Sequence, residues 1–140
     1  MQLINATDVR KNWSETCDSV TRVRPSFIKR TRGALLLASR EDVLSMLAAY
    51  TLTAKIIKDK KSVTLSLNEL DLVENAASIE EAKLLLAESI LDYAEEYYEN
   101  YSLYSKSPNR GSHQPYIIKA LLLGSVERIA EELICQAGEN

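Results

Sequence analysis

The chain has 140 residues, 46% of them hydrophobic and 26% charged, which is typical of a globular protein with a buried core. No stretch approaches the ~18 consecutive apolar residues that cross a bilayer, and the start lacks the basic and apolar regions of a signal peptide. These features argue against membrane classes and predict a cytoplasmic protein with no membrane partner.

The formal net charge of −3 hides a difference between the two halves of the chain. Residues 1–50 carry eight Lys/Arg against five Asp/Glu, a balance of +3, whereas residues 51–140 carry nine against fifteen, a balance of −6. A basic N-terminal half suits an anionic partner such as DNA, and an acidic C-terminal half suits a basic partner such as an RNA-cleaving protein. The alternative is that ordinary solvated surfaces differ by this amount.

The N-terminal segments indicate two brief helices. Residues 2–4 form a short apolar start, and Asn5, an N-cap residue type followed by Asp8, predicts a helix from about Ala6. A second short helix, capped by Asn12 or Ser14, is expected to bury three side chains: Trp13, Cys17 and Val20. Pro25 then begins an extended segment.

A hairpin and a third helix complete the first 50 residues. Residues 27–30 and 34–38 are typical of two strands, joined by a turn in which Gly33 can adopt a positive φ. The hairpin projects three cationic side chains: Lys29, Arg30 and Arg32. Ser39 with Asp42 three positions later predicts a helix that runs to about Tyr50.

The rest of the chain reads as a hairpin followed by helices. Strands are predicted at residues 52–58 and 62–67, and a short third strand at 70–73. Ser78 opens a capping box and a helix of about 25 residues, with apolar positions at steps of three and four. A loop at 105–114 precedes Pro115, and Gly124 separates two short helices, 116–123 and 126 to about 135.

Several motifs in the first third of the chain together resemble the Phd/YefM antitoxins. Residues 1–5 resemble the opening strand of that family, and residues 6–14 resemble its "x-x-A-R-x-N-L-S" helix, with Val9 and Trp13 in place of Ala and Leu. Residues 27–30 resemble the "V-I-T-R" strand, with Lys29 in place of Thr. Gly33 corresponds to the hairpin glycine, and residues 34–42 resemble the "A-V-L-x-S-x-E-D" segment, with two leucines in place of Val-Ile.

The resemblance implies an α+β protein. Residues 1–51 are expected to form a β-α-α-β-β-α domain for dimerisation and DNA binding, and residues 52–140 a small hairpin-plus-helices domain. The family implies a homodimer that binds operator DNA through a set of cationic residues: Arg10, Lys11, Lys29, Arg30 and Arg32. The alternative is that these cations are solvated or pair with Asp8 and Asp42.

The second domain is faintly similar to the small domain of HicB-type antitoxins, in its hairpin, short strand and capped long helix. One face of that helix carries four tyrosines: Tyr93, Tyr97, Tyr101 and Tyr104. Such a stripe predicts either a toxin-binding surface or packing against the C-terminal helices, because any core-facing helix shows the same spacing.

Residues that would carry enzymatic chemistry are sparse. His113, the only histidine, is expected in a surface loop, and Cys17 and Cys135 are expected as small core residues. Glu80-Glu81 stabilises a helix start, Glu95, Glu96 and Glu99 occupy a solvent face, and no phosphate-binding glycine loop is present. We therefore expect no catalytic residue, metal or cofactor, and a protein that is not an enzyme.

The sequence thus predicts the antitoxin of a type II toxin–antitoxin system, which neutralises a cognate toxin and represses its own operon as a DNA-binding dimer. A basic RNase is the favoured toxin. The alternatives are a dimeric interaction module that has lost DNA binding, and a regulator that binds a small ligand under the tyrosine-rich helix.

Overall fold

The computed structural model describes residues 3–138, and the chain divides into two compact units, Met1–Met46 and Leu47–Asn140. Both units combine helices with a sheet, which confirms the predicted α+β class. None of the helices in this described part is long and apolar enough to cross a membrane.

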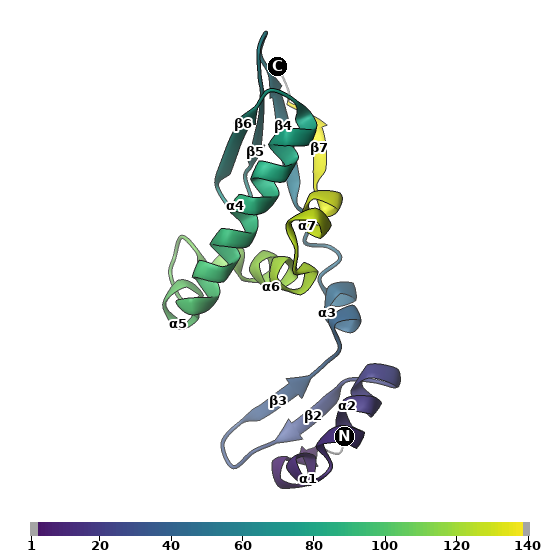
Figure 1. The fold of residues 1–140 in the computed structure, drawn as a ribbon. Coiled ribbons are helices and arrows are strands. Elements are labelled where there is room, and N and C mark those ends of the chain that lie inside the picture. The colour runs from purple at the N-terminus through teal and green to yellow at the C-terminus, as the bar shows by residue number, and fades with distance from the viewer. Residues whose placement is uncertain (1–2, 139–140) are drawn as a thin grey trace. The chain divides into compact units, whose positions relative to one another are not determined.

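The first unit is a three-stranded sheet with three helices (Figure 1). The strand order is β1-β2-β3, with β1 parallel to β2 and β2 antiparallel to β3. Its elements in chain order are β1 (Ile4–Asn5), α1 (Ala6–Lys11), α2 (Trp13–Arg22), β2 (Ser26–Lys29), β3 (Ala34–Leu37) and α3 (Arg40–Met46).

Local sequence signals account for the boundaries of these elements. The Asn5 side chain accepts a hydrogen bond of 2.9 Å from the backbone N–H of Thr7, which caps α1. Gly33 has a φ of 83° in the β2–β3 turn, a conformation that side chains with a Cβ disfavour. The Ser39 hydroxyl accepts from the Asp42 N–H at the start of α3. Helix α3 ends at Met46 rather than near Tyr50, because the Tyr50 N–H donates to the Leu47 carbonyl and forms a turn there.

The core of the first unit is small. Val9, Val20 and Ile28 are its buried hydrophobic side chains among the described residues. The expectation that α2 buries Trp13 is wrong, since this side chain is 55% exposed, and Cys17 is only half-buried. Trp13 begins a helix of ten residues, and a unit this small offers little surface to cover both ends of that helix.

The second unit is a four-stranded sheet with helices. The strand order is β6-β5-β4-β7, antiparallel except for the parallel pair β4–β7. Its elements are β4 (Thr53–Lys58), β5 (Val63–Leu67), β6 (Leu72–Ala76), α4 (Ile79–Glu99), α5 (Tyr101–Tyr104), the 3-10 turn η1 (Gly111–His113), α6 (Gln114–Leu123), α7 (Val126–Glu132) and β7 (Ile134–Ala137).

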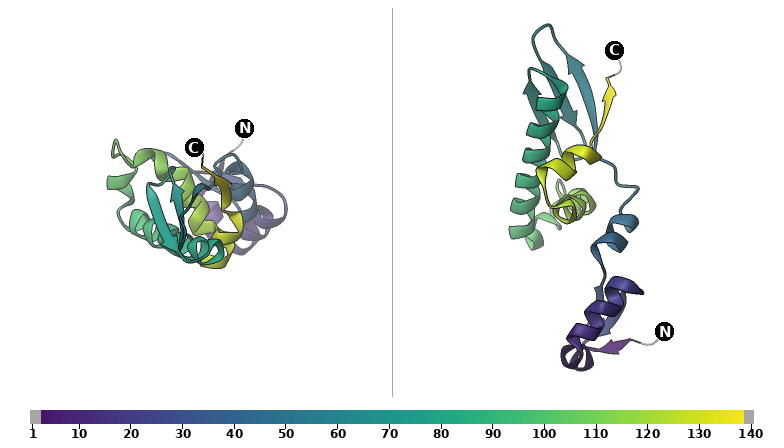
Figure 2. Two further views of the ribbon diagram at one scale, coloured as in Figure 1. Left: turned by 90° about the horizontal axis from the view of Figure 1, so that it is seen from above. Right: turned by 45° about the vertical axis from the view of Figure 1, so that its right-hand side comes forward.

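Helix α4 is the centre of this unit. It packs against β5, β6, α6 and α7, and the views in Figure 2 show it lying along the sheet. Alternate residues of β5 point to the core, where Leu65 and Leu67 are fully buried with Leu86 and Ile90 of α4. The Ser78 hydroxyl accepts from the Glu81 N–H, as the predicted capping box requires.

Three predicted boundaries in the second unit are wrong. The third strand begins at Leu72, because residues 68–71 form a turn in which Asp71 has a φ of 55°. The long helix ends at Glu99, where the Asn100 side chain donates to the Glu96 carbonyl. The last predicted helix stops at Glu132, and Ile134–Ala137 pairs with β4 as a strand that the sequence did not indicate.

Candidate nucleic-acid interface

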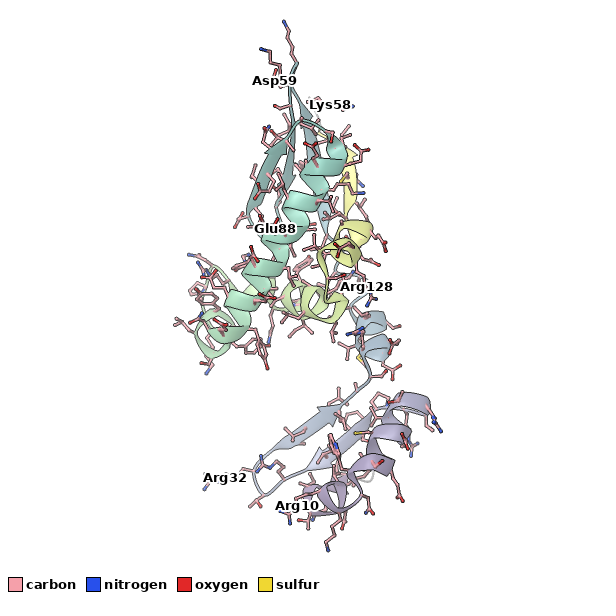
Figure 3. All side chains as sticks on the ribbon, viewed as in Figure 1. Arg10, Arg32, Lys58, Asp59, Glu88 and Arg128 are labelled. Atoms are coloured by element: carbon pink, nitrogen blue, oxygen red, sulfur yellow. The ribbon has the colours of Figure 1, made fainter. Side chains whose placement is uncertain are left out.

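The predicted DNA-binding cations come from two places in the first unit. Arg10 and Lys11 occupy the last turn of α1, and Lys29 ends β2. Arg30 and Arg32 follow in the β2–β3 turn, where the Arg30 N–H donates to the Gly33 carbonyl over 3.2 Å. Figure 3 shows Arg10 and Arg32 at the same end of this unit. All five side chains are exposed.

A hollow of about 750 Å³ brings three of these cations together. Arg10, Lys29 and Arg30 line it, whereas Lys11 and Arg32 are not among the lining residues. The other lining residues are Asn5, Ala6, Thr7, Val9, Trp13, Ile28, Thr31 and Leu35. Cations from a helix and a strand therefore face one concave surface of mixed polarity.

The first unit has the charge to attract a polyanion. Its eight cations outnumber its five carboxylates, and every one of those eight Lys and Arg side chains is exposed. Exposed arginine and lysine can contact phosphate oxygens, and arginine can do so with two parallel hydrogen bonds. Asp8 and Asp42 are the carboxylates that could pair with these cations. Asp8 lines a second hollow, of about 650 Å³, together with Arg24, and is not among the residues that line the first hollow.

Trp13 is the site residue that the sequence reasoning misplaced. The second short helix was expected to bury it, and it instead lines the cationic hollow together with Arg10. The available signal was its position directly after Asn12, at the start of a short helix, where a side chain has few neighbours. An exposed aromatic ring beside arginine can stack on a planar group.

Four of the tyrosines of the second unit form a buried or half-buried cluster: Tyr93, Tyr97, Tyr101 and Tyr104. Tyr97 is fully buried, and its ring meets those of Tyr93, Tyr101 and Tyr104 edge-on, at centroid distances between 5.5 and 6.0 Å. Its hydroxyl donates to the Arg110 carbonyl over 2.9 Å, and burial raises the pKa of both Tyr97 and Tyr93. Tyr97 therefore has no surface for a partner, while toxin binding at the other three stays a prediction.

Arg110 and His113 complete this cluster. The Arg110 guanidinium carbon lies 4.1 Å from the Tyr104 ring centroid and 5.9 Å from that of Tyr93, a cation–π arrangement. One guanidinium nitrogen, Nη1, is buried without a hydrogen-bond partner among the described residues. The tyrosine face is thus occupied by the chain's own loop at residues 105–113.

The expectation that His113 lies on the surface is wrong. Its side chain is buried, and Nδ1 is 2.7 Å from the Tyr93 hydroxyl. Burial lowers the pKa of His113, an effect that nearby Asp71 opposes and Arg110 reinforces. The 3-10 turn η1 directs this histidine inward, and the polar composition of the loop gave no sign of it.

The remaining candidate groups show structural contacts. Cys135, expected in the core, is half-buried in β7, and its partial burial raises the pKa of its thiol. Lys119 is buried and donates to the Tyr50 carbonyl over 3.0 Å, so it ties α6 to the start of the second unit. Within residues 3–138, no group of three or more His, Cys, Asp or Glu is placed to hold a metal ion.

Comparison with known proteins identifies the family. The family model PHD_like, described as "Antitoxin of toxin-antitoxin, RelE / RelB, TA system", matches residues 1–135. A crystal structure from Syntrophomonas wolfei subsp. wolfei, described as an antitoxin part of a toxin/antitoxin system, superposes with a TM-score of 0.89. That protein is 33% identical, and the match covers 99% of this chain and 100% of the other.

No curated protein matches the chain. The family match nevertheless spans nearly the whole length, and the similar structure covers both units. The chain belongs to the PHD_like family, the antitoxins of toxin–antitoxin systems.

Proposed function

We propose that this antitoxin binds and neutralises a cognate toxin through its second unit and represses its own operon as a DNA-binding homodimer through its first. The observation that carries the repressor half is the hollow lined by Arg10, Lys29 and Arg30, which gathers cations from α1, β2 and the turn after β2 on one surface. We assign the first unit to the Phd/YefM type on the motifs of residues 1–42; the weaker HicB similarity of the second unit has only its order of elements as support.

Binding through these cations would be largely electrostatic. Each phosphate contact releases a counterion, so affinity is expected to fall steeply as salt increases. Trp13 and the hydroxyls of Thr7 and Thr31 line the same hollow and would add stacking or hydrogen bonds. In a two-fold dimer, the two copies of this surface would favour a palindromic site with half-sites about 34–36 Å apart.

Exposed apolar side chains support dimerisation through the first unit. Phe27 and Leu36 are neighbours across the β2–β3 ladder, 44% and 50% exposed, on the face opposite to buried Ile28. A small core combined with an uncovered apolar sheet face is typical of a protomer that is completed by a second copy. We expect Leu36→Glu to convert a dimer to a monomer in sedimentation equilibrium; a monomeric wild-type chain would contradict this part of the proposal.

The DNA-binding half is tested with a fluorescent duplex that carries the sequence upstream of the gene. Fluorescence anisotropy at two salt concentrations is compared for the wild type, Arg10→Ala and Arg30→Ala. We expect both variants to bind more weakly and each to lower the salt slope by about 1 per phosphate contact. Arg22→Ala, an exposed arginine of α2 that does not line the hollow, is the matched control. Equal binding by all four proteins would refute this assignment.

The toxin is proposed to be a basic protein such as an RNase, because residues 51–140 carry a balance of −6. The dimeric interaction module without DNA binding remains the alternative function. The outcome that would favour it is a dimeric wild-type chain with no affinity for upstream DNA at low salt.

A further inference from the structure

The outer face of α4 carries a continuous exposed stripe. Most of its members are three or four positions apart, and they lie along the length of the helix on the side opposite to buried Leu86, Ile90 and Tyr97. We call these seven residues the α4 stripe: Glu81, Leu84, Leu85, Glu88, Asp92, Glu95 and Glu99, all of them exposed. Figure 3 labels Glu88, which lies midway along the helix.

The α4 stripe includes apolar side chains that the core of the second unit does not bury. Leu84 and Leu85 are 48% and 40% exposed and, as consecutive helix residues, lie on the two flanks of the stripe, about 100° apart around the helix axis. Tyr98, at the edge of the stripe near the end of the helix, is 64% exposed. Exposed apolar side chains along one helix face of a small unit are typical of a surface that becomes buried against a partner.

The charges of the stripe favour a cationic partner. Five of its seven residues are carboxylates and none is a cation. Helix α7, which packs beside α4, adds exposed Glu127, Glu131 and Glu132 against a single cation, Arg128. Carboxylates of this density repel nucleic acid, and they would repel the identical stripe of a second copy. A cationic protein is the occupant whose charge complements the stripe.

We infer that the α4 stripe is the docking surface for the toxin, whose contact surface is cationic with apolar sites that receive Leu84 and Leu85. This inference rests on the proposed function. It locates toxin binding on the side of α4 opposite to the tyrosine cluster, which the chain's own loop already covers.

The size of the stripe sets how much of the interface it supplies. From Glu81 to Glu99 it is about 27 Å long, and with a helix diameter of about 10 Å it offers about 270 Å². A standard interface takes about 800 Å² from each partner, so the stripe would supply about a third. Helix α7, which packs against α4 and carries exposed glutamates, could supply further contacts.

The test uses the full chain and, as its probe, the purified protein encoded by the open reading frame that adjoins the antitoxin gene. Isothermal titration compares the wild type with the double variant Leu84→Ala/Leu85→Ala. The matched control is Ile57→Ala/Val73→Ala, which truncates two side chains of β4 and β6 that are 56% and 60% exposed. All truncated side chains are exposed, so melting temperatures should stay close to that of the wild type.

We expect the leucine variant to raise Kd by about tenfold or more and the control to raise it by less than about twofold. A second variant, Glu88→Gln/Asp92→Asn, should reduce the dependence of Kd on salt. Wild-type binding that the leucine variant leaves unchanged would overturn this inference alone. Absence of wild-type binding would refute the proposed toxin partner and the inference with it. Loss of self-association by the leucine variant, with toxin binding intact, would assign the stripe to a second copy and overturn the inference.

Discussion

Replacing Tyr97 with Phe tests whether the tyrosine face is part of the core of the second unit. The Tyr97 hydroxyl is buried and donates to the Arg110 carbonyl, so Tyr97→Phe removes the donor while keeping the ring and its three edge-on contacts. Loss of a buried hydrogen bond that leaves its acceptor without that donor costs about 1–2 kcal/mol. For a unit of this size we expect the melting temperature to fall by about 5–10 °C.

The assay is thermal unfolding followed by tyrosine near-UV circular dichroism. Tyr98→Phe is the matched control, because Tyr98 is the next residue of α4, is 64% exposed and has its ring 6.5 Å from that of Tyr101. We expect this control to melt within about 2 °C of the wild type, since exposed substitutions cost within about 0.5 kcal/mol. Equal melting temperatures for Tyr97→Phe and the wild type would refute a stabilising role for this buried hydrogen bond.

Three further predictions concern the second unit. Burial lowers the pKa of His113 in the folded protein below its ordinary value of 6.5, so just below pH 6.5 the unfolded state binds more protons than the folded state. The contribution of His113 to the free energy of unfolding is therefore fully present above pH 6.5 and should be lost as the pH falls through the folded-state pKa. Urea midpoints between pH 5 and 7.5 check this, and His113→Asn should flatten the profile; an equally steep profile in the variant would exclude the histidine. Ser78→Ala should cost about 1 kcal/mol by removing the α4 cap, measured by urea unfolding against Ser102→Ala, an exposed serine; no difference would refute the cap. Ile129→Ala should cost about 2–5 kcal/mol, because this α7 side chain is fully buried; a loss under about 1 kcal/mol in the same assay would contradict the packing of α7 on α4.

Elements that depend on local signals could be predicted from the sequence. Asn5 and Ser78 cap helices because their side chains reach N–H groups two or three residues away. The alternation of Val63, Leu65 and Leu67 indicates one buried strand face, and Gly33 supplies the turn of the first hairpin. Each of these features is encoded within a few consecutive residues.

Features that depend on distant residues could not be predicted. Strand β7 exists because its backbone pairs with β4, about 80 residues earlier, and its short segment continues the apolar pattern of the preceding helix. His113 is buried because it packs against Tyr93, which lies 20 positions earlier in the chain, although the residues next to His113 in the sequence are polar. Trp13 is exposed because the first unit has too little core to cover it.

The candidate site could be predicted only in part, because the grouping of its residues depends on contacts between elements. Residue type marked the exposed cations of the first unit, but their grouping depends on how α1 meets β2, which places Arg10 with Lys29 and Arg30 and leaves Lys11 and Arg32 outside the hollow. The tyrosine spacing, in turn, fits a core-facing helix as well as a partner surface, and nothing in the sequence indicated that Arg110 lies over the Tyr104 ring.

The most direct test of the proposed function is neutralisation in living cells. The protein encoded by the open reading frame that adjoins the antitoxin gene is expressed from an inducible promoter, alone and together with the wild-type chain, and growth is measured. We predict growth arrest by that protein alone and restored growth when the chain is present. Arrest that persists in the presence of the folded chain would contradict its role as the neutralising partner.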